Sequence, residues 1–195
     1  MTTFNPTTYA PAVADLLREP WMPPLDPGRP NEGVHARLAA LTNDNAFAPF
    51  PVCDRDMAVA CRAGLWLYHN YLDESHAISQ ELHTTTGSYW HALMHRREPD
   101  FDNAKYWFRR VGAHPVYTEL RRSAAELAGD APPAAAFLHT QTDWDPFAFV
   151  DLCAAALVGR ASCVELCRQI QKREWELLFD WCFRQAVGAG DPKVE

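Results

Sequence analysis

Residues 54–82 have the sequence DRDMAVACRAGLWLYHNYLDESHAISQEL, and the spacing of their side chains predicts one long helix. Apolar residues recur every three to four positions, which is the period of an amphipathic helix. Asp54 is a suitable N-cap, because its carboxylate can accept the free backbone N–H groups of the first turn. Asp100 is placed in the same way before the helix that follows Pro99. The first half of the stretch, MAVACRAGLWLYHNYL, is apolar nearly all round, so we expect other helices to cover it.

The rest of the chain also favours helices over strands. Helix caps and helix breakers divide it into about eight helical segments. Five prolines between Pro20 and Pro30 exclude regular structure after the first helix. We therefore predict an all-α protein of one domain, an irregular or orthogonal bundle of about eight helices. Its parts are N-terminal helices with a proline-rich loop (1–53), a histidine-rich helical core (54–128), a loop (129–143) and a C-terminal helix pair (144–190).

Composition and charge exclude several classes of protein. The formal net charge of −7 leaves no broad basic surface for a phosphate backbone, so we expect no nucleic-acid partner. No apolar run approaches the roughly 18 residues of a membrane-spanning helix. The first residues lack a basic region followed by an apolar stretch, and none of the six cysteines forms a CxxC pair. We therefore expect a cytoplasmic protein with reduced, buried thiols.

Five of the eight histidines lie within 27 residues. A continuous helix over 54–82 places five polar side chains on one face, within about 40° of His69: His69, Asp73, His76, Gln80 and His83. His91 and His95 repeat the i, i+4 spacing on the next predicted helix, 89–98. Leucine and tryptophan border the first stripe instead of lysine and glutamate. This pattern favours a polar pocket between the two helices, with a solvent-facing stripe as the alternative.

Neutral imidazole and carboxylate bind first-row transition metals well, so the stripe is a candidate site for zinc, iron or manganese. An ion that keeps one coordination position for water acts as a Lewis acid, and the bound water acts as a nucleophile. Asp73 and His76 are the candidate catalytic residues, and Asp73 either binds the ion or orients a histidine. Neither HExxH nor paired Glu-x-x-His motifs occur, so a zinc protease or a di-iron carboxylate bundle is not indicated. The candidate metal ligands are His69, Asp73, His76, His91 and His95.

The segment SYWHALMHRREPDFDNAKYWFRRVG, residues 88–112, adds positive charge to an acidic chain. Arg96 and Arg97, beside two histidines, are candidates for an anion clamp. Trp90 and Lys105 are further candidate substrate-binding residues. The alternative is structural, because cations near a helix C-terminus complement the helix dipole.

Three stretches carry a resemblance to a known family: GLWLYHNYLDESHAISQ (64–80), the 88–112 segment followed by HP at 114–115, and the closing EWELLFDWCFRQAVG (174–188). They resemble a family of bacterial and fungal proteins for which no activity is established. The resemblance covers about a third of the chain. The resemblance implies kinship without a function, so it adds no site residue.

We interpret the chain as a metal-dependent enzyme that acts on a small anionic substrate in a histidine-lined pocket. No Walker A, GxGxxG or GxSxG motif indicates nucleotide binding or a serine hydrolase. The alternative is a non-catalytic helical module that binds a ligand or a protein, with histidine and aspartate in a structural hydrogen-bond network. Both interpretations leave the oligomeric state open.

Overall fold

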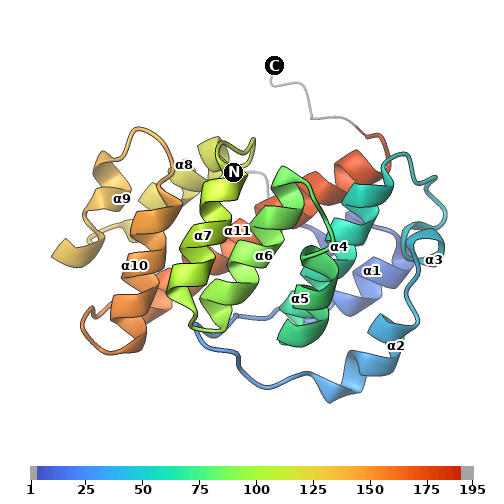
Figure 1. Cartoon of the computed structure of the whole chain (residues 1–195), viewed down its shortest axis with the longest axis horizontal. Helices are drawn as coiled ribbons and strands as arrows, with labels where there is room; N and C mark the ends of the chain where they lie inside the picture. The colour runs from blue at the N-terminus through green and yellow to red at the C-terminus, as the bar shows by residue number, and fades with distance from the viewer. Residues whose placement is uncertain (1–3, 190–195) are drawn as a thin grey trace.

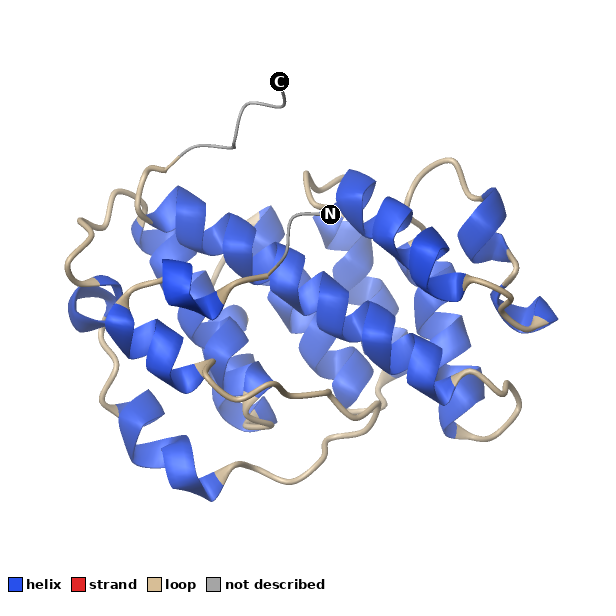
Figure 2. Cartoon of the chain, turned by 180° about the vertical axis from the view of Figure 1, so that it is seen from behind, coloured by secondary structure: helices blue, strands red, loops and turns tan. Residues whose placement is uncertain are grey.

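The computed structural model describes residues 4–189, which form eleven α-helices and three short 3₁₀ helices without a strand (Figures 1 and 2). The all-α prediction is confirmed, but there are eleven helices instead of about eight. The three additional ones are α3, α9 and one that arises because the predicted helix over 54–82 is two helices. None of the helices in the described chain combines the length and the apolar character needed to cross a membrane.

The helices range from four residues in α9 to 23 residues in α11. In chain order they are α1 (Pro11–Leu16), α2 (His35–Ala39), α3 (Asn43–Phe47), α4 (Arg55–Tyr68), α5 (Leu72–Ser79), α6 (Thr85–Arg97), α7 (Phe101–Val111), α8 (Tyr117–Ala128), α9 (Phe137–Thr140), α10 (Pro146–Leu157) and α11 (Val164–Ala186). The 3₁₀ helices cover Pro6–Thr8, Glu32–Val34 and Pro133–Ala135.

The last helix, α11, is the centre of the bundle. It runs behind the green and yellow helices in Figure 1, crosses the molecule diagonally in Figure 2, and contacts α4, α8 and α10. In its second half, Trp175, Phe179 and Phe183 are buried in a core that includes α4 and the N-terminal segments. In its first half, Cys167 and Ile170 are buried in a core shared with α8 and α10. One continuous helix therefore joins both parts of the core.

The helices α4 and α6 meet closely at Gly64. A Cβ atom there would lie 2.8 Å from the indole of Trp90, so a larger residue would force the two helices apart. The Gly64 carbonyl also accepts a hydrogen bond from Trp175 Nε1 at 2.9 Å. Trp90 is completely buried, with 0 % of its surface exposed. It is a core residue, which corrects our expectation that it binds substrate.

The stretch predicted as one helix is broken after Tyr68. Asp54 caps α4 as expected, because its side chain accepts the N–H of Met57. His69 is the C-cap of α4, and α5 begins three residues later. Between them, Asn70 has a φ of 65°, a left-handed conformation that asparagine adopts more readily than most residues.

Distant parts of the chain hold Asn70 in this conformation. Its Nδ2 donates to the carbonyl of Arg29 at 2.8 Å, and its Oδ1 accepts from Arg97 Nη2 at 2.7 Å. The break changes the direction of the chain, so the residues from His69 to His83 do not form one helical face. The predicted stripe is therefore wrong as a continuous surface.

A buried ion pair joins α6 to α11. Arg96 Nη2 donates to Glu174 Oε2 at 2.5 Å, and the two side chains are 1 % and 0 % exposed. The hydroxyl of Tyr89 donates to the other carboxylate oxygen at 2.8 Å, and the Arg96 guanidinium lies 4.8 Å from the ring centroid of Phe149. Burial alone would lower the pKa of Arg96, but the Glu174 carboxylate raises it, so the guanidinium remains charged.

The neighbouring arginine holds the proline-rich connection. Arg97 donates to the carbonyls of Asp26 and Pro27 and to Asn70, and it is 2 % exposed. Burial, and to a lesser extent the charge of Arg96, lowers its pKa to about 9. Both guanidinium groups are buried and bind protein groups, although Arg96 Nη1 has no hydrogen-bond acceptor in the described chain. The two arginines hold helices and a loop together, and their role as a substrate clamp stays a prediction.

We expect Glu174→Gln to lower the free energy of unfolding by about 3–5 kcal/mol, because it leaves the buried Arg96 charge without a partner. Urea denaturation followed by circular dichroism measures the loss. Glu165→Gln is the matched control, since Glu165 pairs with Arg168 at an exposed position and should change stability by less than about 1 kcal/mol. Equal losses in the two variants would contradict a structural role for the buried pair.

Candidate metal centre

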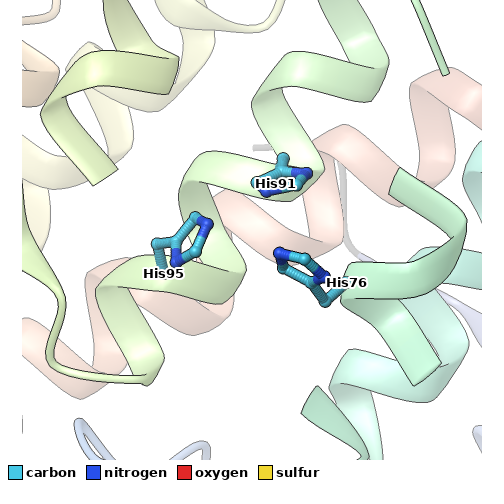
Figure 3. A group of neighbouring side chains, drawn as sticks. All are labelled: His76, His91 and His95. Carbon is cyan, nitrogen blue, oxygen red and sulfur yellow. The ribbon is translucent and has the colours of Figure 1, made fainter. Parts of the chain in front are cut away.

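Three histidines meet at the side of the bundle where α5 faces α6. His76 comes from α5, and His91 and His95 come from α6 (Figure 3). One ligand nitrogen from each lies within 4.8 Å of the other two. The ring centroids are 4.6 Å apart for His76 and His91, 4.7 Å for His91 and His95, and 5.4 Å for His76 and His95. This group, which we call the three-histidine cluster, can hold a metal ion.

A tight junction between α5 and α6 positions the cluster. Thr84 caps α6 by accepting the N–H of Gly87 at 3.0 Å. A Cβ atom at Gly87 would lie 2.2 Å from the carbonyl oxygen of Leu82, so glycine is required at this close approach. Helix α6 therefore returns directly alongside α5. The i, i+4 spacing then places His91 and His95 on one face, toward the α5 histidine.

His91 is fixed by contacts on two sides. Its Nδ1 lies 3.3 Å from Ser79 Oγ, which belongs to the last turn of α5. The indole of Trp107 on α7 stacks on its ring with the centroids 4.0 Å apart. The imidazole is 2 % exposed, so its plane and its position are both determined by packing.

His95 is oriented by a carboxylate. Its Nδ1 lies 2.9 Å from Glu98 Oε2, and an ionised carboxylate only accepts hydrogen bonds. The proton of the neutral ring is therefore on Nδ1, which leaves a lone pair on Nε2. Asn103 Nδ2 lies 3.0 Å from Nε2, as expected for a donor to that lone pair. A carboxylate behind a histidine is the arrangement that orients metal ligands in many proteins.

Burial keeps the α6 histidines neutral. Desolvation lowers the pKa of His91 to about 3, and the neighbouring His95 and His76 add to the effect. Desolvation also lowers the pKa of His95, although hydrogen bonding to Glu98 opposes the shift. Neutral imidazole is the form that binds metals. At neutral pH an ion would therefore displace no proton from these two rings.

The structure does not bring the other two predicted ligands into the cluster. His69 caps α4, and its Nδ1 lies 3.4 Å from Asn31 Nδ2. Asp73 is exposed in the first turn of α5, where its charge complements the helix dipole, and it belongs to no group of ligand atoms with the three histidines. The break at Asn70 separates His69 from α5, whereas Asp73 lies on the same helix as His76 but is exposed in its first turn. Lys105 pairs with Asp151 at 2.5 Å, near the solvent.

Sequence reasoning missed the residues that surround the imidazoles. Ser79, Glu98, Asn103 and Trp107 all contact His91 or His95. The i, i+3 spacing of His95 and Glu98 is a signal that could have identified the orienting carboxylate. Glu98 and Asp100 also form a second, exposed group of possible ligands with His95. Asp100 caps α7, as predicted, by accepting the N–H of Asn103.

No protein-family model, curated protein or solved structure matches this chain. The resemblance to a bacterial and fungal family therefore stays a prediction. The cluster is consequently assigned from its own geometry and chemistry.

We expect His91 to stay neutral in metal-free protein until the pH falls toward about 3, because protonation would place a charge in a buried site beside two other imidazoles. Imidazole ¹⁵N chemical shifts recorded between pH 8 and pH 4 measure this, with free histidine (pKa about 6.5) as the reference. A midpoint near that of free histidine would contradict the buried, neutral ring.

The same depressed pKa values predict a loss of stability in acid. Desolvation lowers the pKa of His69 and of His114 to about 4. The unfolded chain, with histidine pKa values near about 6.5, therefore binds more protons than the folded chain below that pH. We expect full stability above pH 6.5 and a decline as the pH falls toward 4. Urea denaturation at pH 7, 6 and 5 measures the trend, and a constant or rising stability would contradict it.

Proposed function

We propose that this protein is a metal-dependent enzyme whose ion is bound by His76, His91 and His95. The observation that supports the proposal most strongly is the convergence of three imidazoles with one ligand atom each within 4.8 Å. Three protein ligands are typical of catalytic zinc sites, since they leave a fourth position for water or substrate. A structural zinc site would have four protein ligands instead.

The nature of the ligands favours zinc or iron over manganese. All three ligands are neutral nitrogens, and imidazole suits zinc, copper, iron and nickel, whereas manganese prefers carboxylate and water oxygens. A zinc ion with three neutral ligands keeps its full positive charge, so the pKa of a bound water falls to about 7. We therefore propose zinc and a hydrolytic or hydration reaction as the first candidate. Iron with an oxidative reaction is the second.

The surroundings of the cluster support a small anionic substrate. Arg96 and Arg97 are enclosed elsewhere, but the exposed Arg110 lies 5.3 Å from the ring centroid of Trp107, the indole that stacks on His91. This arrangement places a cation beside the cluster, on the side of α7. In the proposal Arg110 attracts the substrate and His76, half-buried on α5, stands at the accessible side of the ion.

The first experiment measures the metal content of tag-free protein, purified without chelator, by plasma mass spectrometry. We expect about one equivalent of zinc or iron, lost in His76→Ala, His91→Ala and His95→Ala. His69→Ala and Asp73→Ala are the matched controls and should keep the ion, because neither side chain belongs to the cluster. Circular dichroism confirms that each variant is folded.

Two outcomes would overturn the proposal. One is a metal content of less than about a tenth of an equivalent after attempted reconstitution, which is well below the content expected of a specific site. The other is loss of the ion in His69→Ala but not in His91→Ala. In the first case the histidines, Ser79 and Glu98 form a structural hydrogen-bond network, and the protein is a non-catalytic helical module.

We expect Glu98→Gln to weaken zinc binding about 10- to 100-fold while the fold persists. The neutral amide oxygen accepts the N–H of His95 more weakly than the carboxylate does, so the imidazole is held less firmly. A competition titration with a chromophoric chelator measures the dissociation constant. Glu81→Gln removes an exposed carboxylate between α5 and α6 and should leave the dissociation constant unchanged. Equal affinities for Glu98→Gln and the parent would contradict an orienting role.

A further inference from the structure

A cavity that none of the three cluster histidines lines lies at the C-terminal end of α7. It has a volume of about 990 Å³ and is formed by the end of α7, residues 112–114, the start of α8 and residues 141–147. This size is at the upper end of the range for small-molecule sites. It is therefore a feature separate from the three-histidine cluster.

The walls combine aromatic rings with two positive charges. Trp144 and Phe147 form part of the apolar lining, and the guanidinium of Arg109 lies 6.0 Å from the Phe147 ring centroid. Arg121 contributes the second cation. Within residues 4–189 neither arginine forms an ion pair with a carboxylate, whereas most other arginines of the described chain have such a partner or a carbonyl.

Two buried N–H donors in the lining have no hydrogen-bond acceptor in the described chain. They are Trp144 Nε1 and Gln141 Nε2. Trp144 is 5 % exposed, and the Gln141 amide is oriented because its Oε1 accepts the N–H of Asp145 at 3.0 Å. A buried donor without an acceptor costs about 1–3 kcal/mol, but neither atom has surface exposed to the cavity, so these donors do not themselves indicate a ligand.

The other polar groups of the lining already have partners or face elsewhere. The carboxylate of Asp145 caps α10 by accepting the N–H groups of Phe147 and Ala148. His114 lies 3.3 Å from Thr86. The Tyr117 hydroxyl also lacks a partner, but its ring packs on the buried Tyr89 with the centroids 5.4 Å apart, and burial raises its pKa with a further contribution from Glu174. Asp143 is the remaining carboxylate, and it is exposed.

We propose that this cavity binds a small organic acid with an aromatic or similarly flat apolar body. The carboxylate or phosphate of the ligand pairs with Arg121 and Arg109. The apolar body fills the space along Trp144 and Phe147. The proposal does not depend on the metal centre, because the two sites share no side chain.

Benzoate is the probe for the test, with benzyl alcohol as the neutral analogue and inorganic phosphate as the anion without a ring. Titrations of the full chain are followed by calorimetry and by the indole ¹H–¹⁵N signal of Trp144, which Trp144→Phe identifies. We expect saturable binding of benzoate with a shift of that signal, and no saturation by the other two compounds up to about 10 mM, the limit of weak binding.

Variants separate a specific site from general charge attraction. Arg121→Gln should raise the dissociation constant for benzoate about tenfold or more, since it removes one charged hydrogen-bonding partner. Arg55→Gln removes an exposed arginine at the start of α4 and should leave binding unchanged. Arg109→Gln, at an exposed position, is the second variant if Arg121→Gln does not fold.

Three results would overturn the proposal. The first is an absence of saturable benzoate binding. The second is binding of benzyl alcohol or phosphate as tight as that of benzoate. The third is an equal effect of Arg55→Gln and Arg121→Gln on the dissociation constant for benzoate. The metal content of the protein bears on none of them, so failure here leaves the three-histidine cluster unaffected.

Discussion

The buried ion pair between Arg96 and Glu174 determines which way the histidines of α6 face in the bundle. Two charges inside a protein must stay paired, because separating them leaves an uncompensated charge in a medium of low polarity. The pair fixes the rotation of α6 against α11. On an α-helix Arg96 points about 100° away from His95 and about 140° away from His91. Once Arg96 faces α11, the two histidines lie on another side of α6, where α5 and α7 cover them.

Local signals in the sequence predicted the features that depend on neighbours in the chain. Asp54 and Asp100 are N-caps because each accepts an N–H three residues later, and His91 and His95 share a face because they are one turn apart. The break at Asn70 depends instead on Arg29 and Arg97, which are 41 and 27 residues away. No spacing within the stretch contains that information, so the sequence predicted His76 correctly as part of a histidine cluster and His69 incorrectly.

The arginines illustrate the same limit. Arg96 and Arg97 beside two histidines resemble an anion clamp as long as their partners are unknown. Glu174 is 78 residues from Arg96, and the carbonyls that bind Arg97 are about 70 residues away, in the proline-rich connection. Composition and periodicity describe which faces are polar, and they do not reveal which polar groups will meet. The cations with open surroundings, Arg109 and Arg121, carry no local signal that separates them from solvated helix-end residues.

The depressed imidazole pKa values explain why a metal ion suits the cluster better than protons do. Protonating two rings whose centroids are 4.7 Å apart would place like charges side by side in a desolvated site, and the lowered pKa of His91 reflects that cost. A divalent ion would concentrate the charge on one atom and could bind one nitrogen from each of the three rings. Glu98 would then have two roles, because it holds the tautomer of His95 and would offset part of the positive charge of the ion. The neutral rings of His91 and His95 can therefore offer lone pairs to a cation, which is the role the proposal gives to the three-histidine cluster.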